Sequence, residues 1–302
     1  MATAVRRREE LEGWLFVSPW LIGFVVFTLG PMLAAAAFAF TDWNLLQGPQ
    51  WVGLANVRTA LLDDPLVWVS LRVTTVYALF SVPLSIALGV GIALLLNARI
   101  AGLRFYRTVY YLPSVLSGVA VALLWRWLYS PDFGLVNGIL ALVGLRGPAW
   151  LADENWALSA LVIMSLWHVG GGVIVYLAGL QGVPTDLYEA AEVDGAPWWP
   201  RFVNVTVPLL TPVLFFQLVV GIIAALQVFT QALIMTNGGP HDATHFFMLY
   251  LYRNAFQFFK MGYASVLGWI LFVYILALTL VVFRSSALWV YYEGERKIQG
   301  AG

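Results

Sequence analysis

The chain has 302 residues, of which 61% are hydrophobic and 11% are charged, so it is too apolar to cover itself with a polar surface in water. Its 16 basic residues balance 16 acidic ones, which gives no reason to expect nucleic acid as a partner. Because cysteine is absent and the 3 histidines are scattered, we expect neither disulfides nor a metal site.

The N-terminal segment places Arg6, Arg7 and Arg8 before an apolar run over residues 14–40. A signal peptide has the same order of charge and apolar residues. This run exceeds the roughly 7 to 15 residues of a signal core, however, and contains Pro31 in place of a clear cleavage site. We therefore expect a retained first membrane span.

Long apolar runs recur along the whole chain. About 20 apolar residues suffice to cross the hydrocarbon of a bilayer. Runs of this kind occupy residues 14–40, 69–96, 109–128, 156–180, 209–236 and 263–283. The sequence thus predicts an all-α polytopic membrane protein with about six transmembrane helices in a single membrane domain over residues 1–302.

Basic residues concentrate in alternate connections, and their distribution sets the expected orientation. The residues on the richer side are Arg6, Arg7, Arg8, Arg99, Arg104, Arg107, Arg201, Arg284, Arg296 and Lys297. We therefore expect a multi-pass protein with both termini, and the loop over about 181–207, in the cytoplasm.

The fourth span carries Trp167, His168, a run of three glycines over 170–172, and Tyr176. Consecutive glycines weaken a helix and permit a kink or close packing. We assign Trp167 and Tyr176 to a candidate substrate path. We expect His168 to hydrogen-bond to a neighbouring helix rather than to carry protons.

The loop over 181–207 is predicted to form a rigid elbow, that is, two short helices joined by a turn. Pro184 ends the preceding helix, Thr185 or Asp186 can cap a new one, and Gly195 permits a left-handed turn. Pro197 and Pro200 then begin a second short helix. By composition alone, a solvated loop whose charges keep it out of the membrane explains the segment equally well.

The fifth span carries small and amide residues on one face. They are Gln217, Gly221, Ala224, Gln227 and Gln231, which fall within roughly a third of the helical circumference. Close packing between membrane helices explains such a stripe. A path for a solute explains it too, because Gln227 and Gln231, one turn apart, would offer donors and acceptors to sugar hydroxyls.

Several absences narrow the function. The sequence has no phosphate-binding Gly-x-x-x-x-Gly-Lys-Ser/Thr motif, so the chain does not hydrolyse ATP by itself. The spans lack the acidic or lysine residues near their centres that ion-coupled carriers often use. No catalytic set falls at a plausible membrane depth. We therefore expect no enzyme activity and no cofactor bound by this chain.

Two groups of motifs carry a family resemblance. Glu189-Ala190-Ala191, Asp194-Gly195-Ala196, Phe202 and Pro208 resemble the cytoplasmic EAA loop of the permease subunits of binding-protein-dependent ABC importers. A second group resembles the carbohydrate branch of these permeases, the maltose type in particular. It includes Thr41-Asp42-Trp43, Gly53-Leu54-Ala55-Asn56, Asn237-Gly238-Gly239-Pro240 and Met261-Gly262-Tyr263-Ala264-Ser265.

The resemblance implies a type I ABC importer permease in a bacterial inner membrane, importing a carbohydrate. It implies that Glu189 contacts a separate ATPase, that Ala190 and Ala191 allow close approach, and that Asp194 and Gly195 belong to the same coupling surface. The implied partners are a second permease, two ATPase subunits that use ATP-Mg, and an extracytoplasmic solute-binding protein. Two alternatives stay open, a permease for a polyol phosphate such as glycerol 3-phosphate and a stand-alone ion-coupled carrier.

Overall fold

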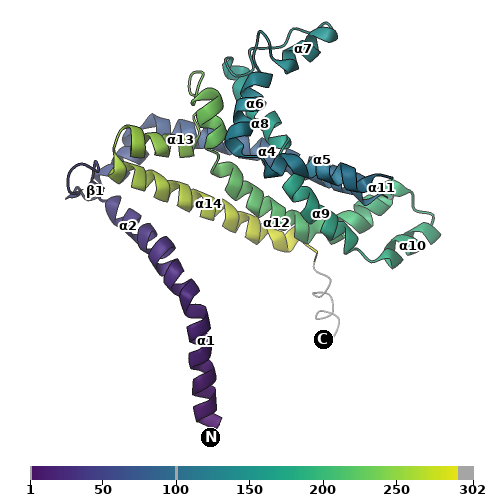
Figure 1. Cartoon of the computed structure of the whole chain (residues 1–302), viewed down its shortest axis with the longest axis horizontal. Helices are drawn as coiled ribbons and strands as arrows, with labels where there is room; N and C mark the ends of the chain where they lie inside the picture. The colour runs from purple at the N-terminus through teal and green to yellow at the C-terminus, as the bar shows by residue number, and fades with distance from the viewer. Residues whose placement is uncertain (1, 99–100, 292–302) are drawn as a thin grey trace. The chain divides into compact units, whose positions relative to one another are not determined.

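The computed structural model describes residues 2–98 and 101–291, which are almost entirely helical (Figure 1). The predicted orientation in the membrane rests in part on basic side chains that the structure does not describe, namely Arg6, Arg7, Arg8, Arg99, Arg296 and Lys297. The chain divides into two compact units, Met1–Val67 with Leu251–Phe272 and Trp68–Tyr250 with Val273–Gly302. A single membrane domain over residues 1–302 stays a prediction.

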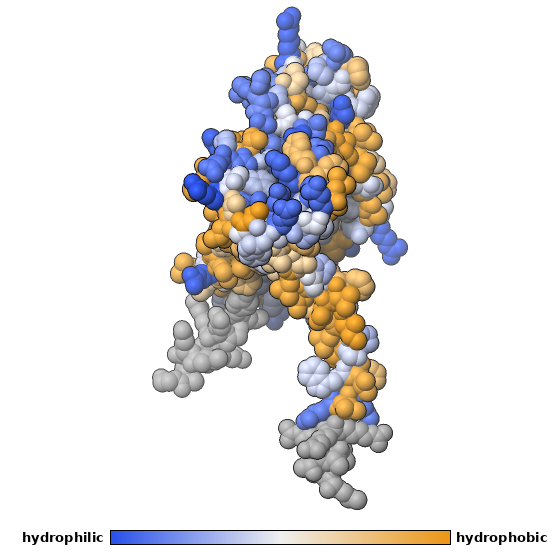
Figure 2. Space-filling view, turned by 90° about the vertical axis from the view of Figure 1, so that its left-hand side faces the viewer, coloured by the Kyte–Doolittle hydropathy of each residue, from blue (hydrophilic) through white to orange (hydrophobic). Residues whose placement is uncertain are grey.

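The first unit contains the N-terminal helix, a short hairpin and the beginning of the last helix. Its elements are α1 (Ala2–Phe24), π-helical Val25–Leu29, α2 (Gly30–Phe38), β1 (Thr41–Asp42), β2 (Gln50–Trp51), α3 (Ala55–Arg58), π-helical Thr59–Asp63, π-helical Arg253–Gln257 and the first part of α14 (Met261–Trp289). The helix over Glu9–Phe38 is apolar and has none of its most apolar stretch buried within the chain. Figure 2 shows apolar side chains along it.

The second unit contains the remaining spans. Its elements are most of α4 (Pro65–Asn97), α5 (Leu103–Val115), α6 (Gly118–Leu128), α7 (Leu135–Leu142), α8 (Glu154–Leu166), α9 (Gly170–Gln181), α10 (Thr185–Val193), α11 (Trp198–Arg201), π-helical Phe202–Thr206, α12 (Val207–Leu226), π-helical Ala232–Thr236, much of α13 (Phe247–Tyr252) and the later part of α14. The later part of α14 runs beside α12, where Phe215 and Phe283 have ring centroids 5.0 Å apart (Figure 1).

The helices agree with the expected number of spans. Four of the described helices are long and apolar enough to cross a membrane, Glu9–Phe38, Pro65–Asn97, Trp198–Leu226 and Met261–Trp289. Two bent pairs raise the number to 6 if each pair is one span. They are α5 with α6, bent by 99°, and α8 with α9, bent by 50°. The all-α, multi-span prediction is therefore confirmed.

The expected fifth helix over 209–236 is interrupted at residues 227–229 and becomes helical again at Thr230. α12 ends at Leu226, and Gln227 leaves the helical conformation with φ −107° and ψ 17°. Val228 and Phe229, which follow, are not helical and pack against the buried core. This packing outweighs the continuation of the helix, so Gln227 and Gln231 do not lie one turn apart on a continuous helix.

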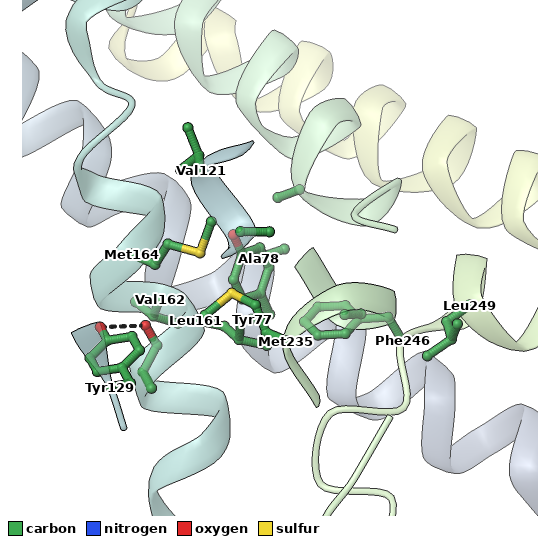
Figure 3. Close-up of a cluster of buried hydrophobic side chains, with 14 of the residues drawn as sticks. Tyr77, Ala78, Val121, Tyr129, Leu161, Val162, Met164, Met235, Phe246 and Leu249 are labelled. Atoms are coloured by element: carbon green, nitrogen blue, oxygen red, sulfur yellow. Dashed lines mark hydrogen bonds between the residues drawn. The ribbon is translucent and has the colours of Figure 1, made fainter. Parts of the chain in front are cut away.

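A buried hydrophobic cluster holds the second unit together (Figure 3). Tyr77 of α4 meets Phe246 edge to face, with ring centroids 5.1 Å apart. The Tyr129 hydroxyl donates to the Ala160 carbonyl at 2.9 Å, which satisfies a phenol that is almost fully buried. These contacts join segments that are distant in sequence and fix the helices around the site described below.

One end of the second unit gathers the ends of several helices. A smaller buried cluster joins Leu96 at the end of α4, Leu180 at the end of α9 and Leu210 near the start of α12. The Tyr291 N–H, just past α14, donates to Thr211 Oγ1 of α12 at 2.8 Å. The loop over 181–207 therefore begins and ends at the same end of the unit as the last described residues.

Three of the sequence motifs meet in the first unit. The Asn56 side chain donates to the backbone carbonyl of Thr41 at 2.9 Å, and the Met261 N–H donates to that of Trp43 at the same distance. Gly262 lies so close to the hairpin that a Cβ placed on it would stand 1.9 Å from the Thr41 oxygen. Tyr263 donates to the Asp64 carboxylate. These motifs thus serve to join the beginning of the chain to α14.

We predict that Gly262→Ala destabilises the protein, because the added methyl group would overlap a backbone carbonyl that cannot turn away. A loss of about 1 to 3 kcal/mol is typical of such overpacking. The matched control is Gly268→Ala on the same helix, where the nearest atom would lie 3.6 Å away in ordinary contact. Thermal unfolding in detergent should give a lower midpoint for Gly262→Ala alone, and equal midpoints for the two variants would contradict the prediction.

Candidate functional site

A cavity of about 510 Å³ lies between α4, α9 and α12 in the second unit. Its polar lining consists of hydroxyl, amide and imidazole side chains, namely Tyr77, Ser81, Ser85, Ser165, His168, Tyr176, Gln217 and Gln231. No aspartate, glutamate, lysine or arginine is among the lining residues of this cavity. Such a surface suits a neutral, hydroxyl-rich solute, because each lining group can donate or accept a hydrogen bond without carrying a fixed charge.

The structure brings together three of the five residues assigned to the candidate path. Gln217, Gln231 and Tyr176 line the cavity. Gln227 is exposed at the end of α12 and does not line it. Trp167 packs instead into the hydrophobic cluster, with its ring 6.0 Å from that of Trp125. Of the glutamines expected on the fifth span, Gln217 and Gln231 therefore line the cavity and Gln227 does not.

Sequence reasoning missed the contribution of the second span. Tyr77, Ser81 and Ser85 follow one another at intervals of four residues on α4, which places them on one face of the helix. Ser165, at the end of α8, was missed as well. The signal was present in the sequence, since hydroxyl residues at this interval within an otherwise apolar span form a polar stripe of the kind recognised on the fifth span.

Glycine makes room for the polar side chains between the helices. A Cβ on Gly172 of α9 would stand 2.7 Å from the Gln217 amide nitrogen, and one on Gly89 of α4 would stand 2.6 Å from the Tyr176 ring. Tyr176 is consequently only 3% exposed. The three-glycine run begins α9, directly after the bend, so the kink and the close packing expected there are both present.

Tyr176 also belongs to the smaller hydrophobic cluster at the end of the unit. Along α9, the residues after Tyr176 that join this cluster are Leu177 and Leu180, and the loop over 181–207 follows directly. Apolar side chains therefore occupy the space between the cavity and the loop.

The loop over 181–207 forms the expected elbow with one difference in its cap. Pro184 itself takes the N-cap position of α10 and makes no side-chain hydrogen bond, so the prediction of a Thr185 or Asp186 cap is wrong. Proline fixes its own φ and ends the preceding helix, which leaves Thr185 as the first helical residue. Gly195 adopts the predicted left-handed conformation with φ +71°.

Several contacts brace the elbow internally. The Tyr188 hydroxyl lies 2.9 Å from Thr206 Oγ1, and Arg201 lies 3.5 Å from the Glu192 carboxylate. The Ala196 N–H donates to the Ala191 carbonyl at 2.9 Å across the turn. These contacts hold α10 to the segment that enters α12, the helix that lines the cavity.

The outer face of α10 is open. Glu189, Ala190, Asp194 and Gly195 are exposed, while Ala191 is half-buried under the turn. Val193 is 89% exposed, which is unusual for an apolar residue on a helix that lies in an acidic loop. Trp198 and Trp199 are also exposed, and Trp198 stacks on Phe202 with centroids 5.5 Å apart. Both acidic and apolar side chains of α10 and α11 are thus accessible.

Comparison with known proteins accounts for this architecture. Residues 71–292 match the family described as binding-protein-dependent transport system inner membrane component. The chain is 41% identical over 295 residues to the probable ABC transporter permease protein YesP of Bacillus subtilis, covering 96% of this chain and 95% of that protein. It is 33% identical to the lactose transport system permease protein LacF of Rhizobium radiobacter, covering 94% and 97% of the two chains.

A solved structure supports the same assignment. The chain superposes on a chain of a bacterial alginate ABC transporter with a TM-score of 0.81 and 25% identity, over 95% of this chain and 96% of that one. That transporter was solved in complex with an alginate pentasaccharide-bound periplasmic protein. The matches extend over nearly the full length of both chains and include the cavity and the elbow. The chain therefore belongs to the binding-protein-dependent transport system inner membrane component family, as a multi-pass permease subunit of an ABC transporter and not as an enzyme.

Proposed function

We propose that this permease subunit imports a neutral mono- or oligosaccharide, and that the cavity between α4, α9 and α12 is its part of the translocation path. The observation that carries the proposal is the uncharged hydroxyl and amide lining of the cavity. LacF, a relative of similar length, is a lactose transport permease, which supports a carbohydrate as the substrate.

The lining also weighs against the alternative of a polyol phosphate. A phosphate carries at least one negative charge, and binding it away from water requires cationic groups nearby. The cavity offers no lysine or arginine among its lining residues. Its one imidazole, of His168, is a weak substitute for a guanidinium. A neutral sugar needs no such partner.

We also propose that the elbow over 181–207 couples ATP use by a separate ATPase to movement of the permease helices. Glu189, Ala190, Ala191, Asp194 and Gly195 would dock on an ATPase subunit, with the exposed Val193 supplying apolar contact. The braces to Thr206 and Arg201 would carry a movement of α10 into α12. ATP-Mg would be used by the ATPase, and this chain would contribute only the surface and the moving helices.

The remaining assembly follows from this assignment. We propose that a second, non-identical permease completes the path, that two ATPase subunits dock below, and that an extracytoplasmic solute-binding protein delivers the sugar above. The end of the second unit that carries the elbow would face the cytoplasm, as would both termini. Arg104, Arg107, Arg201 and Arg284 lie in the segments at this end, which agrees with the excess of positive charge on cytoplasmic loops.

Transport would then alternate between two states. ATP binding would close the ATPase subunits and draw the elbows together, and the helices would turn the cavity from one side of the membrane to the other. The apolar cluster of Leu177, Leu180 and Leu210 would have to separate for release into the cytoplasm. In the structure described, these three side chains are buried and packed together.

We predict that Gln217→Ala weakens transport of the cognate sugar. Loss of one hydrogen bond costs about 0.5 to 1.5 kcal/mol, which corresponds to a roughly two- to tenfold increase in the half-saturating concentration for transport. Gln227→Ala is the matched control, since Gln227 is exposed and lies outside the lining. The measurement is sugar uptake by proteoliposomes that contain the assembled complex and are supplied with sugar-loaded binding protein. Equal uptake by the two variants would remove Gln217 from the path.

We predict that Glu189→Ala uncouples the ATPase while the permease still folds. A central contact in a docking surface is worth more than 1 kcal/mol, so we expect stimulation of ATP hydrolysis by sugar-loaded binding protein to fall about tenfold. The control is Glu154→Ala, an exposed glutamate that begins α8. The measurement is ATP turnover by the complex in lipid after co-expression with its ATPase and second permease.

Two outcomes would count against this role of the loop. Full stimulation in Glu189→Ala would mean that this carboxylate does not couple the subunits. Sugar transport by the chain alone, with no ATPase in the membrane, would favour a stand-alone carrier.

A further inference from the structure

We propose that a groove between α5 and α9 binds the phosphate group of an anionic phospholipid, with Arg107 as its ligand. The groove encloses about 350 Å³ and lies wholly within the second unit. Arg107, Tyr110 and Tyr111 of α5 form one side, and Val173, Ile174 and Leu177 of α9 form the other. None of these six residues lines the cavity proposed for the sugar, so the groove and that cavity are separate.

The hydrogen-bonding capacity of Arg107, the cation in this groove, is incompletely satisfied. The Arg107 guanidinium donates to the Leu96 carbonyl at 3.3 Å. Its Nε is buried and meets no acceptor in the described part of the chain. No carboxylate there forms an ion pair with Arg107. A guanidinium has five N–H donors in a planar fork that matches the oxygens of a phosphate, and a buried charged donor without an acceptor is costly.

The opposite wall suits an acyl chain. Val173, Ile174 and Leu177 present an apolar surface beside the cation. Gly170, which also lines the groove, permits α5 to approach α9 so closely that a Cβ there would stand 2.1 Å from the Tyr110 carbonyl oxygen. A free inorganic phosphate would leave this apolar wall unoccupied, whereas a phospholipid would cover it and meet Arg107 at once.

The surroundings of the groove belong to a membrane interface. α5 exposes Tyr106, Tyr110 and Tyr111 next to Arg104 and Arg107, and tyrosine favours the head-group level because its ring is amphipathic. Arg107 contacts the last turn of α4, which is the end of a span. Basic pockets between transmembrane helices on the cytoplasmic side are suited to anionic head groups. The inference rests on the proposed cytoplasmic placement of this end but not on the identity of the sugar.

The test is the thermal stability of the purified complex, assembled with its second permease and ATPase, during titration with phosphatidylglycerol. Parallel titrations use phosphatidylcholine and inorganic phosphate. The variants are Arg107→Gln and the matched control Arg104→Gln, because Arg104 is exposed on the same helix and lies outside the groove. Native mass spectrometry of the wild-type complex, counting retained phosphatidylglycerol, gives an independent reading should Arg107→Gln fail to fold.

We expect phosphatidylglycerol to raise the unfolding midpoint of the wild type and of Arg104→Gln, and to be retained in mass spectrometry. Loss of the one basic side chain that lines the groove should cost about fivefold in lipid affinity, so Arg107→Gln should need about five times more phosphatidylglycerol for half of the effect. The other two additives should have little influence. Sugar-stimulated ATP turnover is measured separately, so failure of the transport proposal would not be mistaken for failure of this one.

Three results would overturn the inference. The first is an equal response of Arg107→Gln and Arg104→Gln to phosphatidylglycerol. The second is equal stabilisation by inorganic phosphate, which would indicate a site for a soluble anion. The third is loss of the second permease or the ATPase from Arg107→Gln in every lipid, which would mean that Arg107 meets a carboxylate of a partner subunit.

Discussion

In the hydrocarbon of a bilayer each backbone amide and carbonyl needs a partner within the protein, so a span can leave the helical conformation only where it is buried or lines a cavity. The second unit has two such interruptions that border one space. Residues 167–169 separate α8 from α9, and residues 227–229 follow α12. His168 and Val228, one from each interruption, line the same cavity. The position of the cavity thus follows from where the helices break.

The second requirement is space between helices that would otherwise be filled by side chains. Gly89 and Gly172 leave the volume that the Tyr176 ring and the Gln217 amide occupy, and Gly221 admits Val82 in the same layer. Small residues at helix contacts usually permit close packing alone. Here they also admit polar side chains to the interface. The fifth-span stripe thus contains Gly221, which packs against a neighbouring helix, and Gln217, which lines the cavity.

The sequence was sufficient to predict the helical class, the presence of several long apolar spans and the left-handed turn at Gly195, because apolar length and glycine placement are local properties. It was insufficient for the end of α12, where Val228 and Phe229 gain more by joining the core than by continuing a helix. The same limit explains Trp167, whose neighbours in the cluster come from distant segments such as Trp125. The serines of α4 were predictable from spacing but were overlooked.

The elbow and the cavity share no side chains, although both are built on α9 and α12. α10 is fixed to its own chain by Tyr188, Glu192 and the turn at Ala191, all of which lie outside the polar lining. Under the roles proposed above, substitutions in the lining would accumulate without altering the surface that would face the ATPase. With those roles, a lineage of such permeases would diversify in nutrient preference while each member remained compatible with an unchanged, even a shared, energy source.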